Sequence, residues 1–227
     1  DGSWWWAGSL QQGYLWLKNK SLNDNDTLVI LNDDVTFEPD YLEIGTDALQ
    51  HHNKALIIST AYSNETGKLL DGGIYMDWKN WKSSVVLEHD INKINCASTR
   101  GLFMRVTDFL TLGGFYPKLL PHYTSDYEFT NRAYRRGYKL IVEPSLVLHF
   151  SEKTSGIYNF IEETSYLSFL RKLFSKKYTL QPFYMSVFVA LACPWQWKIK
   201  NWLLIWSSTV WKIVRYFFII YYKRFFK

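Results

Sequence analysis

The chain has 227 residues, enough for one sizeable core, and 48% of them are hydrophobic. Its net charge of +5 is unevenly distributed, because eleven Lys and Arg but no Asp or Glu follow Glu163, which leaves residues 1–163 at −6. This excludes a typical nucleic-acid binder, whose positive charge covers its binding face, and favours an acidic body with a basic tail held against anionic lipid.

The first predicted elements alternate between helix and buried strand. Apolar residues at three- and four-residue spacing predict a helix over 4–20, interrupted by Gly8 and Gly13. The apolar, β-branched run 27–31 predicts a buried strand, followed by a helix over 40–51 and a second buried strand over 55–60. Such an order is typical of an α/β sheet, whose ligands collect beyond the carboxyl ends of the strands.

The next elements complete a first domain over residues 1–152. We expect exposed strands over 74–78 and 83–87, and a strand within 95–105 that is broken at Arg100-Gly101. Helices over 108–112 and 126–136 end at glycines, and two strands over 139–142 and 146–150 close the core sheet. Residues 153–227 form a second, helical region that begins with an amphipathic stretch over 158–177.

Asn32-Asp33-Asp34 directly follows the first predicted strand. Carboxylates on such a rigid support suit a hard divalent cation. Asn and Asp are equally favoured in turns and at helix starts, so a simple turn remains an even alternative.

A second acidic motif lies at the start of a predicted helix, in the segment 121–128 that contains Asp126 and Glu128. These acids can simply stabilise the N-terminus of the helix through its dipole, with Thr124 or Ser125 as the N-cap. Alternatively, Asp126 acts as a general base towards an acceptor hydroxyl. His149, which ends the last core strand, is either a metal ligand through its imidazole or, more often for a lone His, an ordinary residue of the fold.

Taken in order, these motifs resemble family 2 inverting glycosyltransferases of the GT-A fold. The resemblance is carried over residues 4–150 by Asn32-Asp33-Asp34-Val35, Gly113-Gly114-Phe115, the helix with Asp126, Arg132 and Arg136-Gly137-Tyr138, Pro144 and His149. It implies a Rossmann-related mixed α/β sheet flanked by helices, and the residues after this sheet add a C-terminal helical membrane-associated tail. The segments 98–101 and 120–129 are most similar to bacterial rhamnosyltransferase-like enzymes of surface-polysaccharide assembly.

The resemblance also implies roles for individual residues. Asp126 is the catalytic base, and Asp34 and His149 bind a divalent metal, Mg²⁺ or Mn²⁺. The donor, a UDP- or dTDP-linked sugar, is implied to lie near Asn32, Asp33, Gly8 and Arg100. The acceptor, a saccharide or a lipid-linked saccharide, is implied to lie near Gly101, His122, Tyr123 and Glu128.

Several features depart from the family pattern. Asn32 replaces the first acid of the usual Asp-x-Asp motif, and Ser125 replaces the acid that commonly precedes the base, so Asp126 is expected to have a less elevated pKa. The chain is also expected to begin after the strand, helix and strand that hold the nucleotide base, which would leave it inactive. Trp4 to Gly8 matches a segment near the donor, with packing of a core helix as an equal alternative.

The tail from residue 183 combines uncharged runs with aromatic residues and isolated cations. The runs 183–193 and 202–211 each fall short of the ~20 residues that span a bilayer. We expect helices that lie in the membrane interface on the cytoplasmic face. The reducing environment of the cytoplasm also fits a chain with two cysteines and no CxxC pair. There are two alternatives. The tail forms a helical subdomain that buries its apolar surface against the body or another subunit, or a helix over 201–222 spans the membrane with Lys212 near its middle.

The favoured function is transfer of a sugar with inversion in cell-surface polysaccharide synthesis. A non-catalytic membrane adaptor that keeps the same fold is the main alternative. A nucleotidyl or phosphoryl transferase ranks last, because the sequence has no GxxxxGK[ST] phosphate loop.

Overall fold

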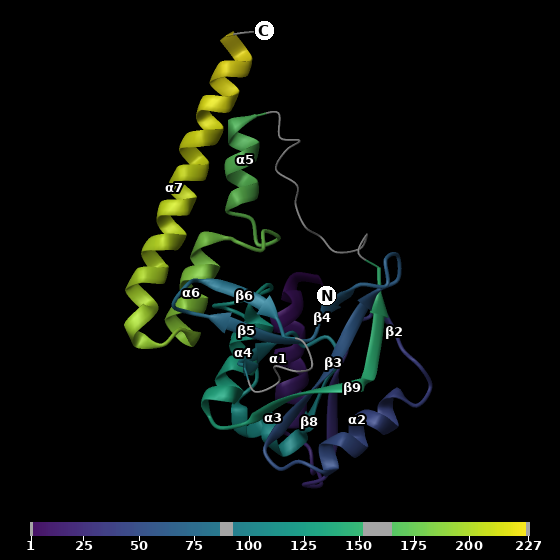
Figure 1. Ribbon diagram of the computed structural model, residues 1–227. Helices are drawn as coiled ribbons and strands as arrows, with labels where there is room; N and C mark the ends of the chain where they lie inside the picture. Colours follow the sequence, from purple (N-terminus) through teal and green to yellow (C-terminus); the bar gives the residue numbers. More distant parts are fainter. Residues whose placement is uncertain (1, 87–92, 152–164, 226–227) are drawn as a thin grey trace.

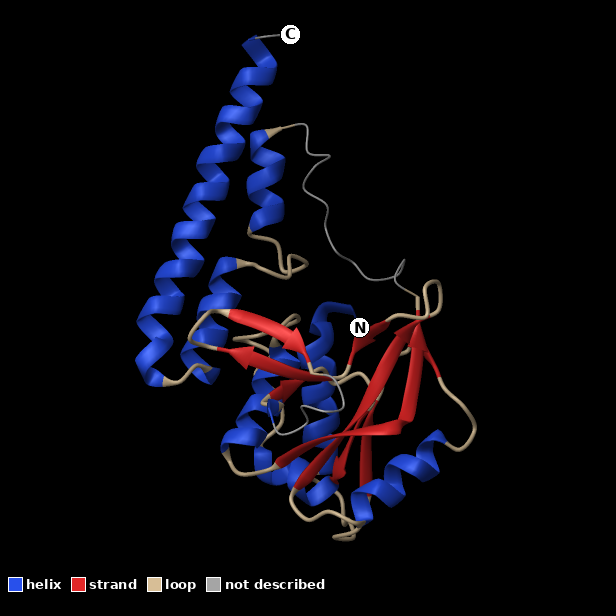
Figure 2. Ribbon diagram, viewed as in Figure 1, coloured by secondary structure: helices blue, strands red, loops and turns tan. Residues whose placement is uncertain are grey.

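The computed structural model describes residues 2–86, 93–151 and 165–225. Its centre is a mixed sheet in the order β1-β8-β3-β9-β2, with β4 paired to β3 (Figures 1 and 2). The strands are β1 (Thr27–Ile30), β2 (Val35–Thr36), β3 (Ala55–Ser63), β4 (Leu69–Asp71), β8 (Leu102–Arg105) and β9 (Lys139–Phe150). Only the β3–β9 pair is parallel.

Alternating side chains of β3 divide the core into two layers. Ala55 and Ile57 point towards α2 (Tyr41–Gln50), together with Phe103 of β8. Leu56 and Ile58 point to the opposite face, which is covered by α1 (Trp5–Leu17), α3 (Val106–Leu112) and α4 (Ser125–Arg135). A short 3-10 helix, η1 (Gly2–Trp4), precedes α1. The expected α/β class, a mixed sheet flanked by helices, is confirmed.

A second, three-stranded sheet joins this body to the C-terminal helices. It contains β5 (Gly73–Asp77), β6 (Lys82–Val85) and β7 (Cys96–Ala97), in the order β6-β5-β7. Side chains of β5 and β7 share a hydrophobic cluster with α6 (Pro182–Ala192) and with the first turns of α7 (Trp195–Phe225). The helical region is completed by α5 (Tyr166–Leu173), which lies beside α7 in Figure 1.

Most predicted elements are found within a few residues of their expected ends, but one expectation is wrong. The strands expected over 139–142 and 146–150 form the single strand β9, because its pairing with β3 shifts register between Ile58 and Thr60 and accommodates Pro144. The apolar run 183–193 corresponds to α6, and the run 202–211 lies within α7, which continues past Lys212 to a length of 31 residues. The short strands β2 and β4 were not predicted. Leu87 and residues 158–164, which belong to predicted elements, lie outside the described residues.

Candidate active site

A polar cavity of about 360 Å³ lies where the two sheets meet. We call it the Asp126 cavity. Its lining combines two carboxylates, one guanidinium and several hydroxyls, contributed by Leu70, Asp71, Ile74, Ser83, Ser84, Val85, Ser98, Arg100, Asp126 and Tyr127. These residues come from β4, β5, β6, the loop after β7, and the start of α4.

The first turn of α4 places Asp126 in this cavity. Thr124, which precedes the helix, has a φ of 65°, an uncommon conformation for a residue with a side chain. The hydroxyl of Thr130, one turn further, donates to the Ala97 carbonyl at 2.9 Å and accepts from the Ala97 N–H at 2.9 Å. These two bonds fix α4 to β7, and so bring Asp126 next to the loop that carries Ser98 and Arg100.

Asp71 and Arg100 form the opposite wall of the cavity. Asp71 ends β4 and is buried, and its carboxylate accepts from the Gly72 N–H at 2.9 Å and lies 3.5 Å from the Arg100 guanidinium. The guanidinium carbon also lies 3.9 Å from the centre of the Phe150 ring. Arg100 is therefore held between an aromatic face and a carboxylate, with its charge directed to the cavity.

The surroundings of both carboxyl groups raise their proton affinity. Burial first, and then the nearby charge of Asp71, raise the pKa of Asp126 to about 7 against the lowering effects of the Tyr127 N–H and Arg100. Burial also raises the pKa of Asp71, although hydrogen bonding to Ser98 and the Arg100 charge oppose it. Asp126 is consequently a carboxyl group that exchanges a proton near neutral pH, as a general base must.

The predicted metal ligands lie at a neighbouring edge of the main sheet. Asp33 and Asp34 are exposed in the turn between β1 and β2, and His149 is exposed on β9, where it pairs with Thr36 of β2. Within the described ranges, no group of three His, Cys, Asp or Glu side chains is arranged to hold a metal. The carboxylate of Asp34, in the turn just before β2, is a donor of the kind that Mg²⁺ or Mn²⁺ takes together with substrate phosphates.

Val35 connects this edge with the Asp126 cavity. It pairs with Phe150, the residue whose ring stacks on Arg100. Asn32, half-buried at the start of the same turn, completes the predicted acidic motif. The structure thus brings the Asn32–Asp34 turn, His149 and Arg100 to adjacent positions along one end of the sheet.

Gly8 and Gly101 have packing roles in the structure. Gly8 is buried in α1, where a Cβ would lie 3.1 Å from that of Trp4. Gly101 has a φ of +75°, and a Cβ there would lie 2.4 Å from the Tyr41 hydroxyl and 2.5 Å from that of Ser59. Only glycine fits this position, and it shapes the loop that presents Arg100.

The remaining predicted acceptor residues are divided between two places. His122 is half-buried between the rings of Trp5, at 5.5 Å, and Tyr123, at 4.2 Å, in the loop before Asp126. Burial, with a smaller effect of Lys177, lowers the pKa of His122, so the imidazole is neutral near pH 7. Neither His122, Tyr123 nor Glu128 is among the residues that line the cavity.

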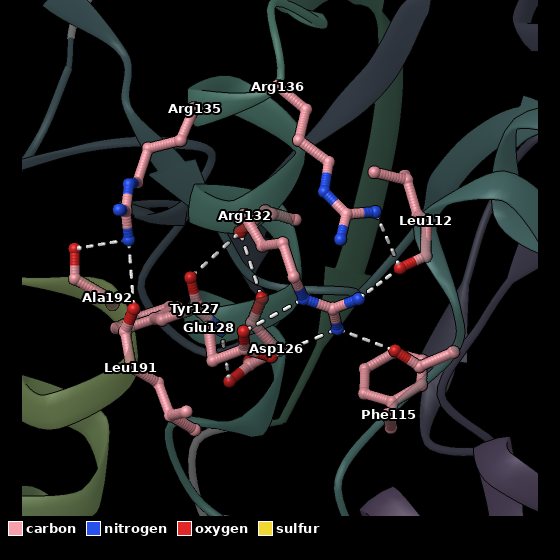
Figure 3. A network of polar contacts seen from close by, with 12 residues as sticks. Leu112, Phe115, Asp126, Tyr127, Glu128, Arg132, Arg135, Arg136, Leu191 and Ala192 are labelled. Atoms are coloured by element: carbon pink, nitrogen blue, oxygen red, sulfur yellow. Dashed lines mark hydrogen bonds and ion pairs between the residues drawn. The ribbon is translucent and has the colours of Figure 1, made fainter.

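Figure 3 shows the network that holds Glu128. Its buried carboxylate accepts from the Arg132 guanidinium at 2.9 and 3.1 Å, and Arg132 also donates to the carbonyls of Leu112 and Gly114. These contacts close α4 against the end of α3. Glu128 therefore contributes to the packing of α4.

The start of α1 holds both loops of the cavity. Trp6 Nε1 donates to Thr99 Oγ1 at 3.3 Å, and the Ala7 N–H donates to the Pro121 carbonyl at 3.1 Å. The first bond fixes the loop with Arg100 and the second fixes the loop before Asp126. Residues 6 and 7 thus contact the two loops that flank the cavity, and the predicted proximity of residues 4–8 to a donor stays a prediction.

Sequence reasoning missed Asp71, Ser98 and Tyr127. Asp71 precedes Gly72-Gly73, and an acid before two glycines resembles an ordinary turn. Its place in the cavity depends on the antiparallel pairing of β4 with β3 across the loop of residues 64–68. The three-residue strand β4 is too short for its sequence to have indicated that pairing.

Comparison with known proteins gives a family match over nearly the whole chain. The model described as glycosyl transferase family 21 matches residues 20–226. No curated protein matches the chain. Among solved structures, it is similar to one described as GalNAc-T7 with UDP, GalNAc and Mn2+, at 12% identity and a TM-score of 0.48. That alignment covers 90% of this chain and 44% of the other, so the chain spans less than half of that protein's length.

Proposed function

Because the chain belongs to glycosyl transferase family 21, we propose that it transfers a sugar from a nucleotide diphosphate to an acceptor hydroxyl, with Asp126 as the general base. The observation that carries this proposal is the position of Asp126, in a cavity beside Asp71 and Arg100. Its pKa of about 7 matches the requirement that a base be ionised yet able to accept a proton at neutral pH.

The reaction is a single displacement with inversion at the anomeric carbon. The acceptor oxygen forms the new glycosidic bond while the bond to the diphosphate breaks, and the carboxylate of Asp126 takes the hydroxyl proton. Arg100, fixed by Phe150 and Asp71, presents positive charge to the departing phosphate oxygens. Ser84 and Ser98 offer hydroxyls to the acceptor sugar.

Asp34 and His149 are the residues that would hold Mg²⁺ or Mn²⁺, together with oxygens of the donor. The cation supplies charge neutralisation for the diphosphate. Asn32 and Asp33, in the same turn, are proposed to contact the ribose and diphosphate of a UDP- or dTDP-linked donor. This part of the proposal is supported by the pairing of β2 with β9.

The acceptor is proposed to be a saccharide on a lipid carrier, in cell-surface polysaccharide synthesis at the cytoplasmic face of a membrane. Residues 195–222 of α7 are long and apolar enough to cross a membrane by length and composition, and they carry exposed aromatic side chains. The similarity of segments 98–101 and 120–129 to rhamnosyltransferase-like enzymes supports the same class of acceptor.

The test is Asp126→Asn in the complete gene product, with Asp47→Asn, an exposed acid of α2, as control. We expect Asp126→Asn to lower sugar transfer by about 10²–10⁴-fold, while calorimetric binding of UDP or dTDP with Mn²⁺ is retained. Asp34→Asn is expected to weaken that nucleotide binding. Unchanged transfer by Asp126→Asn would assign the base elsewhere, and absence of binding to UDP, dTDP and GDP would favour a non-catalytic adaptor.

A further inference from the structure

The two faces of α7 have opposite surroundings. Residues 201, 205, 209, 212 and 216 recur at three- and four-residue spacing and form a packed face. The opposite face exposes large apolar side chains at the same spacing, and we call it the α7 stripe. Its members are Ile199, Leu203, Val210, Val214 and Phe218.

Contacts on the packed face continue along most of α7. Near its start, Asn201 is fully buried and donates to the Trp78 carbonyl at 2.9 Å. Beyond the middle, the Lys212 ammonium donates to the Tyr178 hydroxyl at 3.2 Å, and the Tyr216 ring stacks on Phe169 of α5 at 4.1 Å. The body, the loop between α5 and α6, and α5 itself therefore all lie on one side of α7 (Figure 1).

This arrangement is incompatible with a bilayer surrounding α7. The contacts of Tyr178 and Phe169 place the α5–α6 loop and α5 beside the middle and the C-terminal half of the helix. A spanning α7 would carry the irregular backbone of that loop into hydrocarbon, where unpaired peptide groups are not tolerated. It would also carry Arg171 and Lys172 of α5 to the same depth, at a high cost for each charge.

The stripe itself fits lipid laid along its length. Ile199 is 76% exposed and Phe218 is 63% exposed, so the stripe is open from the first turns of α7 to the last. The chain after Glu163 contains eleven Lys and Arg and no acid, which complements anionic headgroups. Aromatic side chains such as Trp211, beside the stripe and 65% exposed, are favoured at headgroup depth.

We propose that α7 lies in the plane of an anionic membrane surface, with the α7 stripe inserted among the lipids and the α5–α6 loop on the water side. This deepens the proposed membrane location, on which it rests, by defining which face of which helix meets the lipid. The C-terminal end of α7 then stays on the same side of the membrane as the Asp126 cavity.

Binding to vesicles tests the stripe. The assay is sedimentation with phosphatidylcholine vesicles and with vesicles that also contain phosphatidylserine. Two variants are compared: Val214→Glu, on the stripe, and Ser208→Glu, which adds the same charge at an exposed position off the stripe. Val214→Glu should weaken binding to the anionic vesicles by ~10-fold or more, and Ser208→Glu much less. Equal binding by the two variants, or no binding by the parent chain, would overturn the proposal.

Side-specific labelling tests the orientation. In sealed membrane vesicles, Tyr222→Cys near the end of α7 and Lys118→Cys on the body both provide exposed thiols, whereas Cys96 and Cys193 are buried. A membrane-impermeant maleimide should label both introduced cysteines from the same side. Labelling from opposite sides would show a spanning helix and contradict the proposal. Asp126→Asn is expected to bind vesicles normally, so failure of the catalytic proposal and failure of this one remain distinguishable.

Discussion

At the scale of single residues, Asp126 differs from the exposed acids of the chain in the neighbours of its carboxylate. Burial and the charge of Asp71 favour its protonated form, while Arg100 and the Tyr127 N–H favour the ionised form. The charges of Asp71 and Arg100 therefore shift the pKa of Asp126 in opposite directions. Removing one charge or the other gives a pair of predictions.

With Asp126 as the proposed base, the rate of transfer should rise with pH through the pKa of about 7. Asp71→Asn removes a charge that raises this pKa, so the acidic limb of the pH–rate profile should move to lower pH. Arg100→Gln removes a charge that lowers it, and the limb should move to higher pH. The measurement is kcat/KM from pH 5 to 9, and shifts in the same direction for both variants would contradict this electrostatic account.

The same proton links activity to stability. The folded-state pKa of Asp126 lies above its ordinary value of 3.8, so the stability of the fold is greatest below that value and declines as pH rises through about 7. Asp126→Asn should therefore raise the melting temperature at pH 8 more than at pH 5, by about 2–4 °C for each kcal/mol. A scanning calorimetry comparison with Asp47→Asn measures this; a loss of stability at pH 8 would contradict it.

Gly101 illustrates how far a single residue can be interpreted from sequence. Its place after Arg100 indicated a break in a strand, but not that its φ is positive or that three side chains surround it. Gly101→Ala should lower the free energy of unfolding by about 2–4 kcal/mol. Gly67→Ala, also at positive φ but with open space around it, should cost only about 1 kcal/mol in the same urea titration. Equal costs would mean that the crowding at Gly101 relaxes.

At the scale of elements, the helices and buried strands were predictable because their apolar spacing is local. The length of α7 was not predictable for a physical reason: Lys198, Lys200 and Lys212 interrupt the apolar pattern, yet each ammonium reaches an oxygen on the packed side of α7. Long side chains can bury their stems in this way while the helix continues. A charge within an apolar run therefore ends a hydropathy pattern without ending the helix.

The element that carries the base also contains the Glu128–Arg132 ion pair. Glu128→Gln leaves the buried Arg132 guanidinium without its carboxylate and should cost about 3 kcal/mol of unfolding free energy. Glu43→Gln, an exposed acid of α2, is the matched control. Since Glu128 lies outside the cavity, KM for the acceptor should be unchanged; a raised KM with unchanged stability would restore its predicted role in acceptor binding.

At the scale of the whole molecule, the boundary expected near residue 152 does not separate two independent cores. Phe188 of α6 is fully buried, with its ring 5.3 Å from that of Trp78 in the body. Sequence could indicate the helices of the tail but not this contact, because the partners are far apart in the chain. The C-terminal helices and the body share one hydrophobic cluster.

Phe188→Ala should therefore destabilise the whole protein, by about 3–5 kcal/mol, and keep a single unfolding transition. Leu203→Ala, on the exposed stripe, should have little effect in solution. Urea unfolding followed by tryptophan fluorescence and by circular dichroism measures both. Two separate transitions would show that body and tail fold independently.

The edge strand β6 has a consequence for how such an enzyme diversifies. Ser83, Ser84 and Val85 line the Asp126 cavity from a strand whose residues are all exposed, whereas Asp71 on the opposite wall is buried. Mutations on β6 thus alter one wall of the cavity without disturbing the core. Under the proposed function, selection can explore new acceptors on that wall while the chemistry on the other is inherited unchanged.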